Sequence, residues 1–156
     1  MINPNLSLFN NLNVLVVDGD DDSRELLIGL FGTYGIKTIT AKSGNEALEL
    51  IKQHQPNVLI SEIRLPDEDG YSLMEKVKAL ETTHQIKLPA IALTVYASEI
   101  DRAHSISVGF CEHLAKPCNF DTLLSTVAYL TGRDNLIHSV PGESVGSISV
   151  ESVESE

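Results

Sequence analysis

The 156-residue sequence has few cysteines and no clustered metal ligands. Its two cysteines, Cys111 and Cys118, fit neither a CxxC motif nor a Cys/His ligand spacing, and the five histidines are scattered along the chain. A zinc site is therefore not predicted, and the two thiols are expected to be reduced.

Long apolar runs are also absent. No stretch approaches the roughly 18 apolar residues that suggest a membrane-spanning helix, and no basic segment followed by an apolar one marks a signal peptide. We therefore expect neither a membrane span nor a signal peptide, and we expect a cytoplasmic location.

Positive charge is scarce. The chain has 11 lysines and arginines against 22 acidic residues, which gives a formal net charge of −11. Such a charge argues against a nucleic-acid or anionic membrane partner, because both carry negative charge themselves. A basic protein partner is more compatible with this composition.

The length favours one domain with short flanking segments. Residues 1–11 are polar and aperiodic, so we expect a short, loosely held leader. Residues 12–132 carry the apolar pattern of a folded domain. Residues 133–156 are rich in serine and acids, which predicts a mobile acidic tail, although the alternation at 147–151 leaves open a strand added to a sheet edge.

Short apolar runs alternate with helix-like periodicity through the predicted domain. In the fourth helical segment, Ile100, Ala103 and Ile106 recur at helical spacing and are expected to face inward. This alternation predicts a three-layer α/β/α domain with a parallel sheet, and the fifth strand, being less apolar, is expected at the sheet edge. The five strands are predicted at 14–17, 36–41, 58–60, 88–93 and 110–115.

Polar side chains stand just past four of these strands. Asp18, Glu62, Thr94 and Lys116 follow the first, third, fourth and fifth runs. Because the carboxyl ends of parallel strands meet at one edge of the sheet, these side chains are expected to converge. Acids, a hydroxyl and an ammonium group together would suit a phosphoryl group with Mg²⁺.

Four segments carry a family resemblance in the right order. They are VLVVDGDDDSRELL, NVLISEIRLPDEDGYSLM, IALTVYAS and EHLAKP. On these motifs, residues 12 to about 131 resemble the receiver domain of bacterial response regulators, known from CheY. The resemblance implies a flavodoxin-like fold, with a five-stranded parallel sheet of order 2-1-3-4-5.

The resemblance also implies roles for matching residues. Asp18 falls on the first metal-site acid, Thr94 on the switch hydroxyl and Lys116 on the lysine that contacts the phosphoryl group. Pro117 falls on a proline that follows a cis peptide bond.

Three positions depart from the family pattern. Glu62 stands where the family has its phosphorylated aspartate, Gly19 stands where it usually has a second metal-site acid, and His113 replaces a switch tyrosine or phenylalanine. Asp20 is one residue from the missing acid, so we keep it as a substitute metal ligand. His113 is either a pH-sensitive ring or a half-buried polar filler, and the second interpretation is favoured.

Both acidic-site changes are expected to weaken phosphoryl acceptance. The extra methylene of Glu62 moves its carboxylate by roughly 1.5 Å, and a misplacement near 1 Å can slow a reaction about a hundredfold. Gly19 removes an oxygen ligand, so Mg²⁺ binding is expected to be weak. Glu62 could instead reach Lys116 or Thr94 as a permanent anion.

The sequence therefore predicts a non-enzymatic, receiver-like signalling module of a two-component phosphorelay. The favoured hypothesis is a phosphorylation-independent pseudo-receiver that contacts a histidine kinase or a downstream effector. One alternative is a receiver that still accepts phosphate from a histidine kinase. A third is a phosphatase similar to haloacid dehalogenases, because VVDGDD contains a DxD motif in which Asp18 would be the nucleophile and Asp20 the general acid.

Overall fold

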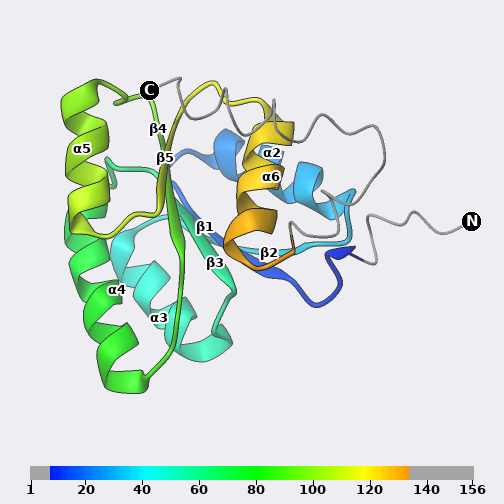
Figure 1. The fold of residues 1–156 in the computed structure, drawn as a ribbon, viewed down its shortest axis with the longest axis horizontal. Coiled ribbons are helices and arrows are strands. Elements are labelled where there is room, and N and C mark those ends of the chain that lie inside the picture. The colour runs from blue at the N-terminus through cyan, green and yellow to red at the C-terminus, as the bar shows by residue number, and fades with distance from the viewer. Residues whose placement is uncertain (1–7, 134–156) are drawn as a thin grey trace, which may run out of the picture.

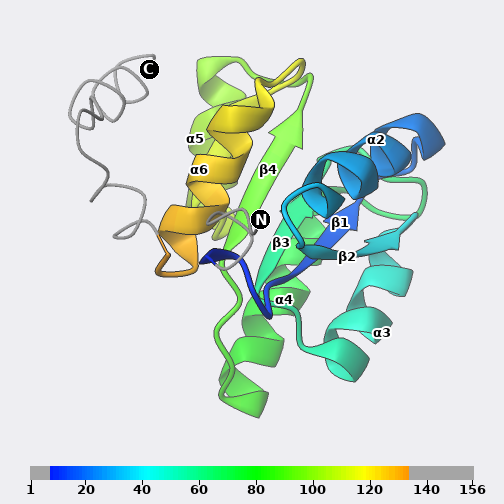
Figure 2. The same cartoon turned by 90° about the vertical axis from the view of Figure 1, so that its right-hand side faces the viewer.

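The computed structural model describes residues 8–133 and contains a five-stranded parallel sheet of order β2-β1-β3-β4-β5. Helices cover both faces of this sheet (Figures 1 and 2). The predicted α/β/α fold and strand order are thus confirmed, and β5 lies at an edge as expected. Along the chain, the elements are β1 (Asn13–Val17), α2 (Asp21–Gly32), β2 (Lys37–Ala41), α3 (Gly44–His54), β3 (Val58–Ser61), α4 (Gly70–His84), β4 (Ala90–Thr94), α5 (Glu99–Val108), β5 (Glu112–Ala115) and α6 (Phe120–Leu130).

The central strands are apolar on both faces because each face is covered by helices. In β1, Val14 and Val16 join the core beneath α2 and α6, whereas Leu15 and Val17 join the core beneath α3 and α4. This is the alternation that a pleated strand imposes on successive side chains. Figure 1 shows α2 and α6 on one side of the sheet and α3, α4 and α5 on the other.

The turn after β3 is tied to the start of α3. The carboxylate of Asp67 accepts hydrogen bonds from the backbone N–H groups of Gly44 and Asn45, both at 2.9 Å. Desolvation is the largest single effect and raises the pKa of Asp67, but the backbone N–H groups of Gly44, Asn45, Asp67 and Glu68 together lower the pKa below its usual value. The Asp67 side chain therefore fixes a loop that borders the carboxyl edge of the sheet.

The inward face predicted for α5 is wrong. Ile100 is 81% exposed and Ile106 is 47% exposed, while Ser105 is the buried residue of this helix. The helix packs beside β5 and α4 through a polar and aromatic face, which includes a stacked pair of Tyr71 and His104 rings 3.8 Å apart. The two isoleucines are consequently left on the surface.

The folded domain begins before the predicted boundary at residue 12. Phe9 is 1% exposed and lies in the core beneath α2 and α6, where its ring meets Tyr34 edge to face at a centroid distance of 6.0 Å. Residues 1–7 and the tail beyond Arg133 lie outside the described part of the chain.

Phe9→Ala should lower the free energy of unfolding by about 3 kcal/mol, because it empties a buried aromatic site. Tyr129→Ala is the matched control, since Tyr129 is an exposed aromatic residue of α6, and it should cost less than about 1 kcal/mol. Urea denaturation of both variants measures the difference. If both variants lose the same free energy of unfolding, Phe9 is not part of the cooperative core.

Candidate functional site

Three of the four strand-end side chains predicted from the sequence, Asp18, Glu62 and Lys116, meet at the carboxyl edge of the sheet, whereas Thr94 ends β4 at the same edge but does not line the cleft. Backbone hydrogen bonds extend the ladder beyond the strands, from Asp18 N to Ala41 O at 3.0 Å, from Glu62 N to Val17 O at 2.9 Å and from Lys116 N to Thr94 O at 2.9 Å. The edge forms a cleft of about 680 Å³. Its lining residues are Asp18, Gly19, Asp20, Glu62, Arg64, Leu65, Pro66, Val95, Tyr96 and Lys116.

Lys116 bridges the two buried acids of this cleft. Its Nζ lies 2.7 Å from Asp18 Oδ2 and 3.1 Å from Glu62 Oε1. Burial disfavours the ammonium form, but the hydrogen bonds and charges of Asp18 and Glu62 outweigh burial, so the pKa of Lys116 rises above its usual value of 10.5. This stabilising effect is present at neutral pH and is lost as the pH rises through the folded-state pKa.

Glu62 uses both carboxylate oxygens. Besides the ion pair through Oε1, Oε2 accepts a hydrogen bond from the backbone N–H of Ile63 at 2.7 Å, and the residue is 8% exposed. Of the two partners considered for Glu62, the carboxylate therefore reaches Lys116. The Thr94 hydroxyl oxygen instead accepts a hydrogen bond from the Tyr96 N–H at 3.0 Å.

The acids near β1 do not assemble a metal cage. Asp18 Oδ2 faces Lys116, and its Oδ1 accepts a hydrogen bond from Asp20 N at 2.9 Å. The Asp20 side chain caps α2, where Ser23 donates to Oδ2 from its backbone N–H at 3.0 Å and from its hydroxyl at 2.8 Å. The Ser23 bonds lower the pKa of Asp20.

Magnesium therefore has a poor donor set in this arrangement. Within residues 8–133, no three His, Cys, Asp or Glu side chains are grouped to hold a metal ion. Mg²⁺ prefers several unpaired oxygens in octahedral geometry, whereas both Asp18 oxygens are occupied and Gly19 supplies no side chain. The residues do not fit the ion as they stand.

Gly19 also allows close packing of the neighbouring loop. A Cβ placed on Gly19 would lie 3.3 Å from both Cγ and Cδ of Pro66. That distance is tighter than most Cβ contacts, so any side chain at position 19 requires a small shift of the proline loop. The close approach of the proline loop therefore depends on the absence of a side chain at position 19.

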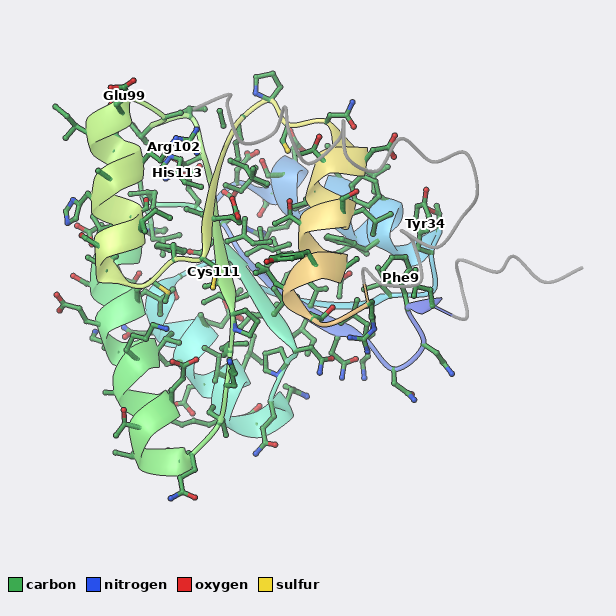
Figure 3. The ribbon with its side chains drawn as sticks, viewed as in Figure 1. Phe9, Tyr34, Glu99, Arg102, Cys111 and His113 are labelled. Carbon is green, nitrogen blue, oxygen red and sulfur yellow. The ribbon has the colours of Figure 1, made fainter. Side chains whose placement is uncertain are left out.

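His113 is more deeply buried than the half-buried position expected from the sequence. It is 1% exposed, its Nδ1 lies 2.7 Å from Ser105 Oγ, and its Nε2 lies 2.9 Å from Tyr96 O. Burial lowers the pKa of His113, and the nearby Arg102 charge acts in the same direction. Arg102 also donates to the His113 carbonyl oxygen at 2.7 Å, and Figure 3 labels both residues beside α5.

Arg64 is a site residue that the sequence reasoning did not identify. Its guanidinium lies over the Tyr96 ring, 5.0 Å from the ring centroid, at the border of the cleft. No motif or spacing in the sequence links Arg64 to Tyr96. Only the folded loops bring these two side chains together. The Lys116–Pro117 peptide bond is cis.

Comparison with known proteins identifies one family. The model of the response regulator receiver domain matches residues 14–128. An uncharacterized 14.6 kDa protein from the sodA1 3′ region of Leptolyngbya boryana is 39% identical over 106 residues, which are 68% of this chain and 79% of that protein. The transcriptional regulatory protein ZraR of Escherichia coli O157:H7 is 27% identical over 82% of this chain, which spans only 28% of ZraR.

Solved structures agree with this family. A two-component response regulator from Clostridium difficile superposes with a TM-score of 0.73 at 26% identity, covering 80% of this chain and 99% of that one. The chemotaxis response regulator CheY4 of Vibrio cholerae has a TM-score of 0.69 at 27% identity, covering 76% and 98%. The Ssk1 receiver domain of Saccharomyces cerevisiae, crystallised with the phosphotransfer protein Ypd1, shares the fold, with a TM-score of 0.74 at 21% identity and coverage of 79% and 90%.

Lys116→Met should lower the free energy of unfolding by about 3 kcal/mol at neutral pH, because it leaves two buried carboxylates without a counter-charge. Urea denaturation at neutral pH measures this loss.

Lys76→Met is the control, since Lys76 pairs with Glu68 at 2.8 Å but is half exposed, and it should cost less than about 1 kcal/mol. If the two lysine variants lose the same stability, Lys116 does not hold the site together.

Proposed function

The chain belongs to the response regulator receiver domain family, and we propose that it is a two-component signalling module that works through protein contacts without being phosphorylated. In this proposal Glu62 is a fixed anion at the phosphoacceptor position. One observation carries the proposal, namely the Lys116 ammonium held between Glu62 Oε1 at 3.1 Å and Asp18 Oδ2 at 2.7 Å.

The geometry of Glu62 supports a structural charge over a nucleophile. One of its oxygens faces the ammonium of Lys116 and the other accepts the Ile63 N–H. An oxygen in such bonds is stabilised as an anion and is a poorer attacking group, because attack would require breaking a charge-assisted hydrogen bond. The Glu62–Lys116 ion pair forms without the transfer of a phosphoryl group, so in this proposal it is present at all times.

The donor set around Asp18 supports the same conclusion. Asp18 is engaged with Lys116, and Asp20 caps α2 instead of turning into the cleft. We accordingly propose that Mg²⁺ binds weakly. The capping role of Asp20 also leaves it badly placed as the general acid of a phosphatase, so the enzyme hypothesis gains no support from the geometry.

Output would pass through α5, β5 and α6. In this region and in the adjoining loop, several large apolar side chains face solvent, and the chain as a whole carries a formal net charge of −11. A basic protein partner, either a histidine kinase or a downstream effector in the cytoplasm, is the kind of partner we propose. On α5, on α6 and in the β4–α5 loop, the exposed large apolar side chains are Val95, Tyr96, Ile100, Ile106 and Tyr129. None of the helices within residues 8–133 combines the length and apolarity of a membrane span.

Incubation with Mg²⁺ and acetyl phosphate tests the proposal. Intact-mass measurement should show no phosphoryl adduct on the wild-type chain, because its carboxylate is displaced and its metal ligand is missing. The double variant Gly19→Asp, Glu62→Asp should show the adduct, since it restores both acids.

Gly19→Ala, Glu62→Asp is the matched control, because it places a Cβ against Pro66 without adding a metal ligand. It should form less adduct than the double-acid variant. An adduct on the wild-type chain would instead support the second candidate function, a receiver that still accepts phosphate.

A further inference from the structure

A groove of about 460 Å³ lies at the amino edge of the sheet, at the opposite end from the cleft. Its lining comes from the end of α3, the loop before β4 and the end of α6, and it includes Asn57 and Pro89, the residues that precede β3 and β4. Figure 2 shows α6 running down to the edge from which the strand arrows start.

The floor of this amino-edge groove is apolar. Ile51 and Leu88 line it and are each 1% exposed, and the half-buried side chains of Ile86 and Leu130 also line it. A ligand that brings apolar groups to this floor would remove further apolar surface from water, which favours binding.

The charged residues that line the groove are both cations, Lys87 and Arg133. Among residues 8–133, neither of them forms an ion pair with a carboxylate. Glu81, the acid closest to Lys87 along the chain, is already engaged, because its Oε1 pairs with Lys78 at 3.2 Å and its Oε2 accepts the Leu88 N–H at 2.7 Å. The groove therefore suits a ligand that combines carboxylates with apolar groups.

The sequence that follows Arg133 has this composition. Residues 134–156 begin directly after the groove residue Arg133 and contain five acids but no lysine or arginine. Within them, the segment 147–156 reads SISVESVESE and combines three branched apolar side chains with three glutamates. A small anion would meet the two cations and leave the apolar floor exposed, whereas this segment can use both.

We propose that the amino-edge groove binds residues 147–156 of the same chain. The carboxylates of Glu151 and Glu154 pair with Lys87 and Arg133, and the branched apolar side chains of the segment cover the floor. The inference goes beyond the proposed function and does not rest on it, because no residue of the cleft takes part.

The connection to the groove is long enough for this contact. Residues 134–146 span up to about 40 Å when extended, and Arg133, where they begin, itself lines the groove. Such a tether gives an effective concentration on the order of 1 mM. A contact with a dissociation constant of about 1 mM between separate molecules is therefore about half occupied within one chain.

A tryptophan in the segment can report the contact, because the chain has none. In full-length Val150→Trp, the groove should shield the indole from acrylamide, a neutral quencher that does not respond to charge. The synthetic peptide 147–156 with the same substitution is the reference for an unbound segment. At half occupancy its quenching constant should be about twice that of the full-length protein.

Reversal of the two groove charges should release the segment. In the Val150→Trp background, Lys87→Glu, Arg133→Glu should raise the quenching constant to that of the peptide, because two attractions become repulsions. Lys37→Glu, Lys42→Glu is the matched control, since it changes the net charge equally at two exposed lysines outside the groove. The control should keep the shielding.

Reversal of the segment charges tests the same pairs from the other side. Glu151→Lys, Glu154→Lys should also release the segment, and it alters no residue of residues 8–133, so it is informative even if the groove variant does not fold. Combining both reversals should restore the shielding, because each new lysine then faces a new glutamate.

A quenching constant of full-length Val150→Trp equal to that of the peptide overturns the proposal. Equal release by the Lys37, Lys42 control, or no recovery of shielding in the combined variant, overturns it as well. Shielding that is lost on about hundredfold dilution would assign the groove to the segment of a second copy and contradict the contact within one chain. A phosphoryl adduct on the wild-type chain would contradict the proposed function alone.

Discussion

The ammonium of Lys116 between two buried carboxylates is the interaction on which the carboxyl edge of the sheet depends. Asp18 and Glu62 come from different strands and would repel each other without it, and burial makes that repulsion expensive. The parallel ladder places the three groups together, because Asp18, Glu62 and Lys116 each continue the hydrogen bonding of a strand by one residue. The fold therefore builds a site in which one ammonium group is the partner of both carboxylates.

The cleft and the apolar surface beside it share one loop. Tyr96 donates to Thr94 at the cleft and accepts from His113 toward α5, so the loop connects the end of β4 to the packing of α5. Helix α5 buries Ser105 and not its isoleucines, so it contacts β5 through a polar hydrogen bond between Ser105 and His113. The isoleucines Ile100 and Ile106 are then left on the surface.

The fold and the main site residues were predictable, whereas the detailed partnerships were not. Alternating apolar runs imply parallel strands, and parallel strands bring Asp18, Glu62 and Lys116 to one edge, so their approach followed from topology. Asp20 was considered as a metal ligand because of its place in the sequence, but the backbone directs it to cap α2. The expected inward face of α5 failed because helical spacing reveals an apolar stripe without revealing whether the neighbouring elements reach it.

The sequence by itself indicated alternating strands and helices and the residues that follow the strands, and its motifs resembled those of the receiver family, which implied the strand order. These inferences depend on local patterns and residue identity. Only the tertiary structure decided that Glu62 pairs with Lys116 and not Thr94, that Pro66 closes over Gly19, and that His113 is fully enclosed. These contacts join residues that are distant along the chain. Their distances depend on loop paths and on competition between hydrogen-bond partners, which local patterns do not encode.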